Sequence, residues 1–183
     1  MDPNILLFMA IYDSFHSPAA NVLFSVITLG GNLLSWAMVG LVLVIKRKER
    51  PAVDLLVAGL ILAVVVSALK YSIDLPRPFM VIPGITQLTI GPMGNETDPG
   101  FPSFHAAMVT AGALILYSAY PRFKVPLALL VFLVALSRIY LGVHYPLDVI
   151  VGSLIGFLVG KIAVMYKDDD LLFDRLFRKL RLV

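Results

Sequence analysis

Long apolar stretches separated by short polar segments run along most of the chain. A helix that crosses a bilayer needs about 20 mostly apolar residues, and five stretches approach or exceed this length. They cover approximately residues 21–45, 52–73, 103–120, 125–141 and 146–166. The pattern predicts an all-α fold, an integral membrane bundle of about five transmembrane helices. In the last stretch, we expect the small-residue stripe Gly152-x3-Gly156-x3-Gly160 to pack within the bundle.

The two ends of the chain are predicted to lie on the membrane surface. Residues 1–20 contain a short apolar run that carries Asp13 and is followed by His16, which favours an N-terminal interfacial helix over a sixth span. Residues 167–183 mix acidic, apolar and basic side chains, a pattern typical of an amphipathic helix on the cytoplasmic leaflet. We expect residues 1–183 to form a single domain.

The composition agrees with a membrane protein and excludes several functional classes. Hydrophobic residues make up 59% of the chain and charged residues 15%, whereas soluble domains are near about 45–50% and about 25%. The net charge of +3 does not indicate a nucleic-acid partner, because apolar stretches separate the charges. Since the chain has no cysteine, it forms no disulfide, thiolate nucleophile or Cys-ligated metal site.

Lys and Arg are distributed unequally between the two sides of the predicted bundle. All but three lie in the connections 46–50 and 122–124 or in and after the last span, the side that the positive-inside trend assigns to the cytoplasm. The exceptions, Lys70, Arg77 and Arg138, fall at the opposite face. A cation at this depth costs about 2.5–3.5 kcal/mol on insertion scales, so we expect each to have a partner or a function.

Two histidines and one acid share that face with the three cations. His105 opens the third span, and His144 and Asp148 lie at the entry to the fifth. Because successive spans alternate in direction, all of these side chains are expected to meet at one end of the bundle. Fixed cations suit a dianionic ligand, and guanidinium groups match phosphate oxygens, so a phosphate-binding site is predicted.

Hydrolysis of a phosphate ester needs a nucleophile and a proton donor, and two histidines can divide these tasks. Asp148 follows His144 by four residues, so its carboxylate can accept from one ring nitrogen and leave the other free to attack phosphorus. His105 then remains as the general acid. Pro102 and Ser103 precede a helix whose first N–H groups are free to bind an anion.

Metal-dependent catalysis is the main chemical alternative. Mg²⁺ prefers carboxylate ligands, and most of the acids expected on this face lie in one loop without ligand spacing. These acids are Asp13, Asp74, Glu96, Asp98 and Asp148. Zinc would need three or more His, Cys or acid ligands, whereas only two suitable histidines are available. We therefore expect the site to use neither a metal nor another cofactor.

Three motifs together resemble the signature of the type 2 phosphatidic acid phosphatase (PAP2) superfamily. They are Lys70-x6-Arg77-Pro78, Pro102-Ser103-Phe104-His105 and Ser137-Arg138-x5-His144-x3-Asp148. The resemblance implies a metal-independent phosphohistidine mechanism, with His144 as the nucleophile, Asp148 as its orienting acid and His105 as the leaving-group acid. It also implies that phosphate is held by Lys70, Arg77, Ser103 and Arg138.

Phe104 departs from the resemblance, because the family usually has glycine at this position. Its backbone N–H can still bind phosphate if the local φ is negative, whereas a required positive φ would distort the anion cradle. The side chain could point into lipid or line the entrance for the acyl chain.

The expected function is hydrolysis of a lipid phosphate monoester or diphosphate. The resemblance favours an isoprenoid diphosphate, with phosphatidylglycerol phosphate and phosphatidic acid as alternatives. We expect the site at the extracytoplasmic face of the cytoplasmic membrane, with the lipid entering sideways between helices. A phosphotransferase and a non-catalytic lipid-phosphate binder or transporter stay open as other classes.

Overall fold

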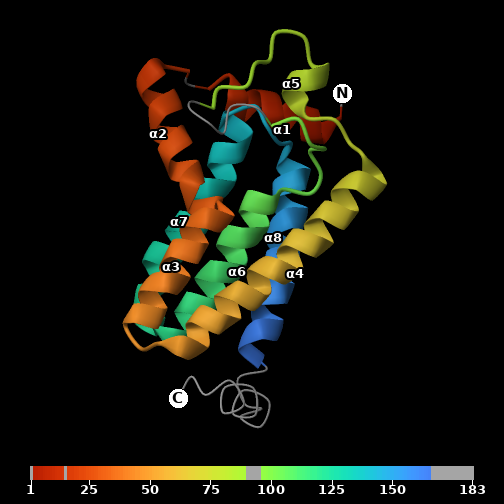
Figure 1. Ribbon diagram of the computed structural model, residues 1–183. Helices are drawn as coiled ribbons and strands as arrows, with labels where there is room; N and C mark the ends of the chain where they lie inside the picture. Colours follow the sequence, from red (N-terminus) through yellow and green to blue (C-terminus); the bar gives the residue numbers. More distant parts are fainter. Residues whose placement is uncertain (1, 15, 90–95, 166–183) are drawn as a thin grey trace.

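The computed structural model describes residues 2–14, 16–89 and 96–165, and all regular secondary structure in these ranges is helical. This confirms the all-α prediction. The elements are α1 (Pro3–Tyr12), α2 (Pro18–Thr28), the 3-10 turn η1 (Leu29–Gly31), α3 (Leu33–Ile45), α4 (Glu49–Ile73), α5 (Pro78–Val81), α6 (Phe104–Ala119), η2 (Pro121–Phe123), α7 (Lys124–Tyr140) and α8 (Pro146–Met165) (Figure 1). The predicted tail helix, 167–183, lies outside the described residues.

α6 is the central helix of the bundle and contacts α3, α4, α7 and α8 (Figure 1). Its 16 residues correspond to about 24 Å, less than the roughly 30 Å of a bilayer core. In Figure 1 the first turn of α6 lies deeper in the bundle than the last turn of α7 and the first turn of α8. Side chains at the start of α6 are therefore inside the bundle rather than at its rim.

Three helical stretches are long and apolar enough to cross a membrane: Glu49–Val81, Pro121–Tyr140 and Pro146–Met165. α2 and α3 add a fourth crossing if they form one broken span, since together they pass the same test with a 56° bend between them. Many large apolar side chains on these helices are exposed, as a lipid environment requires. The chain is a multi-pass membrane protein, with fewer full-length spans in its described part than the five predicted.

The predicted first span, residues 21–45, is two helices rather than one. Gly31 in the intervening turn passes so close to α6 that a Cβ atom there would lie 2.7 Å from the Cβ of His105. The next residue, Asn32, caps α3 by accepting a hydrogen bond from the N–H of Leu34 (2.8 Å). The bend therefore follows from a tertiary contact and a local cap.

Small residues let α6 and α8 pack backbone to backbone. A Cβ atom at Gly152 would lie 2.3 Å from the carbonyl oxygen of Ser103, and one at Gly156 would lie 2.1 Å from that of Ala107. Gly160 makes a similarly close approach one turn later. This confirms that the stripe packs within the bundle, and it places the start of α6 directly against the start of α8.

Within the predicted interfacial lead-in, residues 1–20, the described residues form α1 and the first turn of α2. α1 lies crosswise over the end of the bundle (Figure 1) and contacts α7 and α8. Phe8 and Tyr12 on its inner side are buried, whereas Leu6 and Leu7 are half exposed. α1 therefore covers the site end of the bundle in addition to presenting an apolar outer side.

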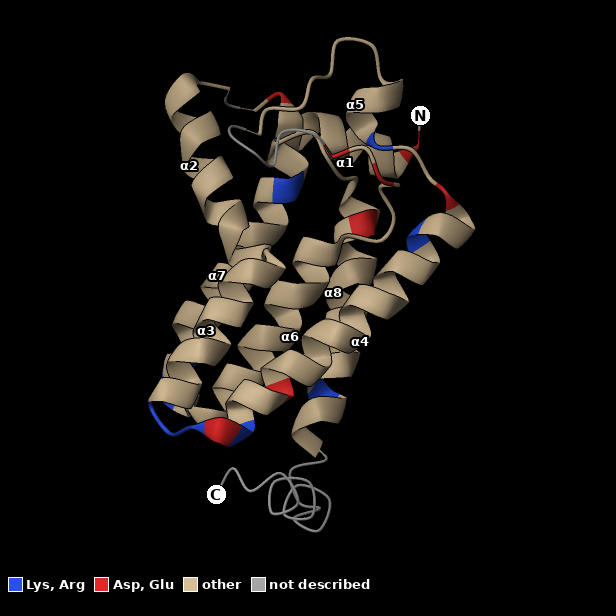
Figure 2. Cartoon of the chain, viewed as in Figure 1, with Lys and Arg blue, Asp and Glu red and all other residues tan. Residues whose placement is uncertain are grey.

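Charged side chains gather toward the two ends of the bundle and leave a long uncharged midsection (Figure 2). The connection between α3 and α4 is basic, with Lys46, Arg47 and Lys48 in sequence. The opposite end contains both cations and acids, which come from α4, α7, α8 and the loop after α5. The distribution fits a bilayer spanned by the midsection.

We predict that Gly156→Ala destabilises the protein by about 1–3 kcal/mol, because the added methyl group would overlap the carbonyl oxygen of Ala107. Gly40→Ala is the matched control, since a Cβ there would meet nothing nearer than the carbonyl oxygen of Ala52 at 4.0 Å. Thermal unfolding in detergent compares the two variants, and we expect no loss for the control. Equal losses would contradict the packing assignment.

Candidate functional site

A charged cavity of about 300 Å³ lies where α4, α6 and the turn between α7 and α8 meet. It is lined by Asn32, Lys70, Arg77, Glu96, Asp98, Phe104, His105 and His144. The other three predicted residues lie next to it. Asp148 contacts His144, and Arg138 pairs with Glu96. The N–H of Ser103 donates to the carbonyl oxygen of Asp148 (3.0 Å), so the structure brings all eight predicted residues together.

The turn after α7 has the hydrogen bonds of a Schellman motif. The N–H of Gly142 donates to the carbonyl of Ile139 (3.0 Å), and the N–H of Val143 donates to that of Arg138 (3.3 Å). Gly142 has a φ of 76°, which glycine adopts without strain. The N–H of His144 also donates to the Arg138 carbonyl (3.2 Å), so this turn holds the backbone of His144 against the end of α7.

α1 supports the same turn from outside the bundle. The side-chain oxygen of Asn4 accepts a hydrogen bond from the N–H of Leu147 (3.0 Å) in the first turn of α8. Phe8 packs edge-on against Tyr145, with ring centroids 5.5 Å apart. These contacts hold the residues on the C-terminal side of His144.

Hydrogen bonds on both ring nitrogens determine the tautomer of His144. Asp148 Oδ2 lies 3.4 Å from Nδ1 and also accepts from the N–H of Tyr145 (2.9 Å), which caps α8. On the other side of the ring, Nε2 is 3.2 Å from Arg77 Nη1. Because a guanidinium group donates and cannot accept, Nε2 is the acceptor and the proton is on Nδ1, facing Asp148.

The surroundings of His144 favour its neutral form. Its side chain is buried, and this burial lowers the pKa well below the usual imidazole value. The nearby charges of Arg77, Arg138 and Lys70 lower the pKa further. Nε2 is therefore unprotonated, and its lone pair accepts the hydrogen bond from Arg77 Nη1.

Arg77 connects most parts of the site. Its side chain is 2% exposed, and its Nε donates to the carbonyl oxygen of Asp98 (2.8 Å). Nη1 donates to the carbonyl of Val143 (3.1 Å) in the turn that carries His144. The two terminal nitrogens also pair with Glu96 (2.5 Å) and with the Asp98 carboxylate (2.8 Å). One planar side chain thus joins the loop 96–100 to the α7–α8 turn.

The start of α6 offers backbone donors to the cavity. Ser103 is the N-cap, and its hydroxyl accepts from the N–H of Ala106. Within the described residues, the N–H groups of Phe104 and His105 have no hydrogen-bond acceptor. Phe104 lies in the helix without a positive φ, so the distorted-cradle alternative is wrong. Its half-buried side chain lines the cavity and packs against the core instead of pointing only into lipid.

His105 lies one residue further along α6 and also lines the cavity. Its Nε2 is shielded from solvent and has no hydrogen-bond partner among the described residues. A buried polar atom without a partner is unfavourable by about 1–3 kcal/mol. This makes His105 Nε2 available to a polar group that enters the cavity.

Arg138 reaches the cavity from α7 and is fully buried. Its Nη1 donates to the hydroxyl of Thr28 at the end of α2 (2.9 Å), and its Nη2 pairs with Glu96. Lys70, near the end of α4, pairs with Asp98 (2.9 Å) and donates to the carbonyl oxygen of Pro99. Each cation therefore has a specific acceptor that orients it.

Sequence reasoning missed four residues of this site. Thr28 and Asn32 flank the bend between α2 and α3, and the Gly-Gly-Asn sequence inside an apolar stretch is the signal that could have indicated them. Glu96 and Asp98 were weighed only as metal ligands. In the described part of the chain, no group of three or more His, Cys, Asp or Glu side chains is arranged to hold a metal ion.

A family model described as the PAP2 superfamily matches residues 51–170. The chain belongs to this superfamily. An undecaprenyl-diphosphatase from Sulfolobus acidocaldarius is 34% identical over 125 residues, which cover 68% of this chain and 59% of that protein. A decaprenylphosphoryl-5-phosphoribose phosphatase from Mycobacterium tuberculosis is 52% identical over 63 residues, 34% of either chain. The match thus spans about three fifths of the first relative and one third of the second.

The fold of this PAP2 protein is similar to that of a solved superfamily structure. The crystal structure of Aquifex aeolicus LpxE superimposes with a TM-score of 0.80 and 33% sequence identity. The alignment covers 91% of this chain and 97% of the other. The similarity therefore extends beyond the residues that the family model matches.

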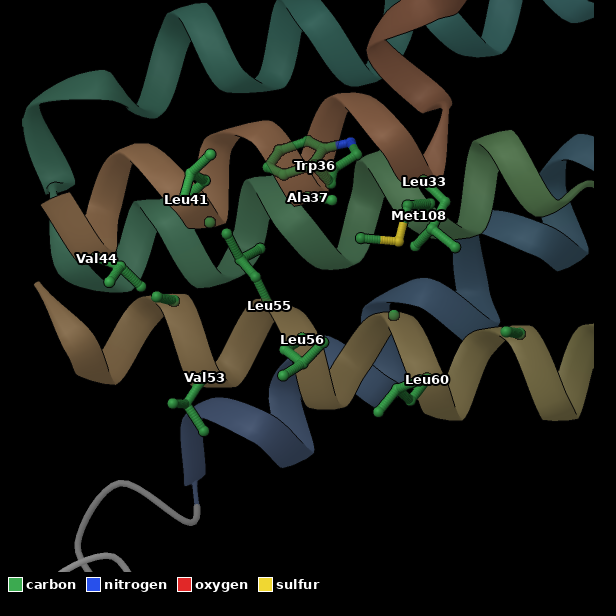
Figure 3. A pocket seen from close by; sticks show the side chains of 14 residues that line it. Leu33, Trp36, Ala37, Leu41, Val44, Val53, Leu55, Leu56, Leu60 and Met108 are labelled. Carbon is green, nitrogen blue, oxygen red and sulfur yellow. The ribbon is translucent and has the colours of Figure 1, made fainter. Parts of the chain in front are cut away.

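An apolar groove of about 390 Å³ runs between α3 and α4 of this PAP2 protein (Figure 3). Leu33 and Met108 lie at one end, and Val44 and Val53 at the other (Figure 3). Leu33 directly follows Asn32, and Met108 is one helical turn after Phe104. Since Asn32 and Phe104 line the charged cavity, the groove begins next to it.

We predict that Thr28→Val lowers the free energy of unfolding by about 1–3 kcal/mol, because a methyl group cannot accept from the buried Nη1 of Arg138. The two side chains have similar shapes, so the change removes a hydroxyl with little effect on packing. Thr110→Val is the control, since that hydroxyl bonds only within α6, to the carbonyl of Ala106. Thermal unfolding in detergent should show a smaller loss for the control, and the reverse order would contradict the role of Thr28.

Proposed function

We propose that this PAP2 protein is a metal-independent lipid phosphatase that acts through a phosphohistidine intermediate. The observation that carries the proposal is the placement of His144 in the cation-lined cavity, with Nδ1 facing Asp148 and Nε2 facing Arg77. An imidazole oriented by Asp148 suits attack on phosphorus once the substrate phosphate draws Arg77 Nη1 away from Nε2.

The proposed first step transfers a phosphoryl group to His144. The lone pair of Nε2 forms a bond to phosphorus as the bond from phosphorus to the leaving oxygen breaks. His105, in its protonated form, gives that oxygen a proton and becomes neutral. Lys70, Arg77 and Arg138 stabilise the charge on the phosphoryl oxygens, with the free N–H groups at the start of α6. Asp148 stabilises the positive charge that develops on the ring.

The second step returns the enzyme to its starting state. A water molecule attacks phosphorus, His105 takes its proton, and the bond from phosphorus to Nε2 breaks to release orthophosphate. The same constellation would serve a phosphotransferase if another acceptor replaced water. We favour hydrolysis because the named relatives are a diphosphatase and a phosphatase.

We infer that the physiological substrate is an isoprenoid diphosphate. The names of both relatives refer to polyprenyl compounds, undecaprenyl for one and decaprenyl for the other. The groove between α3 and α4 is almost entirely apolar and begins beside the cavity, so it suits a long hydrocarbon chain whose phosphate lies in the cavity. Phosphatidylglycerol phosphate and phosphatidic acid are the alternative substrates.

We also propose that the cavity faces the extracytoplasmic side of the cytoplasmic membrane. The basic connections 46–50 and 122–124 lie at the other end of the bundle, which the positive-inside trend places in the cytoplasm. Substrate would then enter from the outer leaflet, sideways between helices.

We predict that His144→Ala abolishes orthophosphate release from lipid diphosphates, because no other group replaces the nucleophilic nitrogen. His16→Ala is the matched control, since His16 is exposed and packs against Tyr12 and Tyr140 outside the cavity. Phosphate release is measured in detergent, with water as the only acceptor, on a panel of isoprenoid diphosphates, phosphatidylglycerol phosphate and phosphatidic acid. Undiminished turnover by His144→Ala would contradict the mechanism.

The same assay tests the absence of a metal. We expect EDTA to leave the rate within about twofold of the untreated enzyme, because cationic side chains supply the charge stabilisation. Strong inhibition by EDTA that added Mg²⁺ reverses would favour metal chemistry instead.

Filling the groove tests the proposed chain site. We predict that Gly40→Phe raises KM for a long-chain isoprenoid diphosphate and leaves KM for a short-chain analogue unchanged, because Gly40 lines the groove far from the phosphate. Val64→Phe is the control, since Val64 is on α4, 70% exposed and outside the groove. Equal effects on both substrates, or an equal effect of the control, would contradict chain binding here.

A further inference from the structure

Two carboxylates form ion pairs with the cationic side chains of the cavity. Here the cation cradle means Lys70, Arg77 and Arg138. Glu96 bridges Arg77 and Arg138, and Asp98 bridges Lys70 and Arg77. Every member of the cradle therefore contacts a carboxylate from the loop before α6. The oxygens of a bound phosphate group would form the same kind of ion pair in place of these carboxylates.

Glu96 and His144 both contact the same nitrogen of Arg77. Oε2 of Glu96 is 2.5 Å from Arg77 Nη1, and the same nitrogen is 3.2 Å from His144 Nε2. Its other oxygen pairs with Arg138. A planar anion held by two guanidinium groups beside the nucleophilic nitrogen imitates the phosphoryl group in the proposed first step.

Asp98 is attached in a different way. Its carbonyl oxygen accepts from Arg77 Nε (2.8 Å), and the N–H of Gly100 donates to the carbonyl of Leu75 (2.7 Å). The backbone around Asp98 is thus fixed to the segment that carries Arg77. Its carboxylate is 39% exposed and contacts Arg77 on Nη2, whereas Glu96 is 15% exposed and contacts Nη1, the nitrogen that faces His144.

We propose that Glu96 is an internal competitor for the phosphoryl position, and that substrate and orthophosphate bind only when its carboxylate leaves Arg77 and Arg138. Asp98 is a positioning residue that keeps Lys70 and Arg77 in place while Glu96 exchanges with the ligand. The effect of Glu96 on turnover rests on the proposed function. Its effect on orthophosphate binding does not, because binding can be measured without turnover.

This exchange addresses a problem that a phosphate-binding cradle creates for a hydrolase. Three buried cations and free helix N–H groups bind the product orthophosphate as well as the substrate phosphate. When orthophosphate leaves, the Glu96 carboxylate returns to Arg77 and Arg138. These buried cations are then never without a counter-charge. The apparent affinity for any phosphate ligand is reduced by the fraction of molecules in which Glu96 occupies the position.

The test measures orthophosphate binding to the full chain in detergent, from the rise of the unfolding midpoint with phosphate concentration. We expect Glu96→Gln to bind orthophosphate about tenfold more tightly than the unsubstituted protein, since the neutral amide competes less well for two guanidinium groups. In turnover assays, the same variant should have a lower KM for lipid diphosphate and a lower inhibition constant for orthophosphate.

Two further variants separate occupation of the position from the general effect of removing a negative charge. Glu96→Asp keeps the charge but shortens the side chain by one methylene, so it should reach both arginines poorly and also bind orthophosphate more tightly. Asp98→Asn removes a charge from the same network without clearing the phosphoryl position, and its gain should be under about threefold. Glu49→Gln, at the far end of α4, should leave binding unchanged.

The proposal is overturned if Glu96→Asp binds orthophosphate like the unsubstituted protein, or if Asp98→Asn gains as much affinity as Glu96→Gln. It is also overturned if Glu96→Gln weakens orthophosphate binding, which would make Glu96 a supporting counter-ion only. If the unsubstituted protein binds orthophosphate but releases none from any lipid, the proposed function is wrong. The binding data of the variants still test the competition by Glu96 in that case.

Discussion

Three cationic side chains are buried at one end of an apolar bundle, and the surrounding structure provides each with an acceptor. Lys70, Arg77 and Arg138 are 5%, 2% and 0% exposed, so without compensation each would carry a large desolvation penalty. Carbonyl groups of the loop 96–100, the hydroxyl of Thr28 and two carboxylates supply that compensation. These contacts fix the loop before α6 and the end of α2 against the cations, and Arg138 Nε stays without a partner among the described residues.

Close packing of α6 on α8 determines the depth of the site. The glycines of α8 allow its first turns to contact the backbone of α6, and the N–H of Ser103 bonds directly to the carbonyl of Asp148. The acid that faces His144 and the helix start that carries His105 are therefore fixed relative to each other without any loop between them. Since α6 is shorter than a bilayer core is thick, the cavity residues at its start lie below the end of the bundle instead of at its surface.

The sequence alone could predict the helical fold and which chemical groups share one end of it. Apolar periodicity and alternating helix direction suffice to predict that Lys70 and Arg138 lie at the same end of the bundle, because both residues are within helices. The four-residue spacing of His144 and Asp148 predicts a contact because both lie at one helix start. In contrast, the bend at Gly31 depends on the close approach of α6, and the positions of Glu96 and Asp98 depend on cations far away in the chain. Such long-range contacts leave no periodic pattern in the sequence.

The contacts of α1 determine how changes at the amino-terminal end affect the site. Asn4 caps the first turn of α8, and Phe8 packs on Tyr145, so α1 holds the segment that immediately follows His144. Neither Asn4 nor Phe8 belongs to the three motifs that carry the predicted site residues. A fusion, truncation or altered start site at this end therefore acts on the alignment of His144, although in sequence it is the region most distant from it.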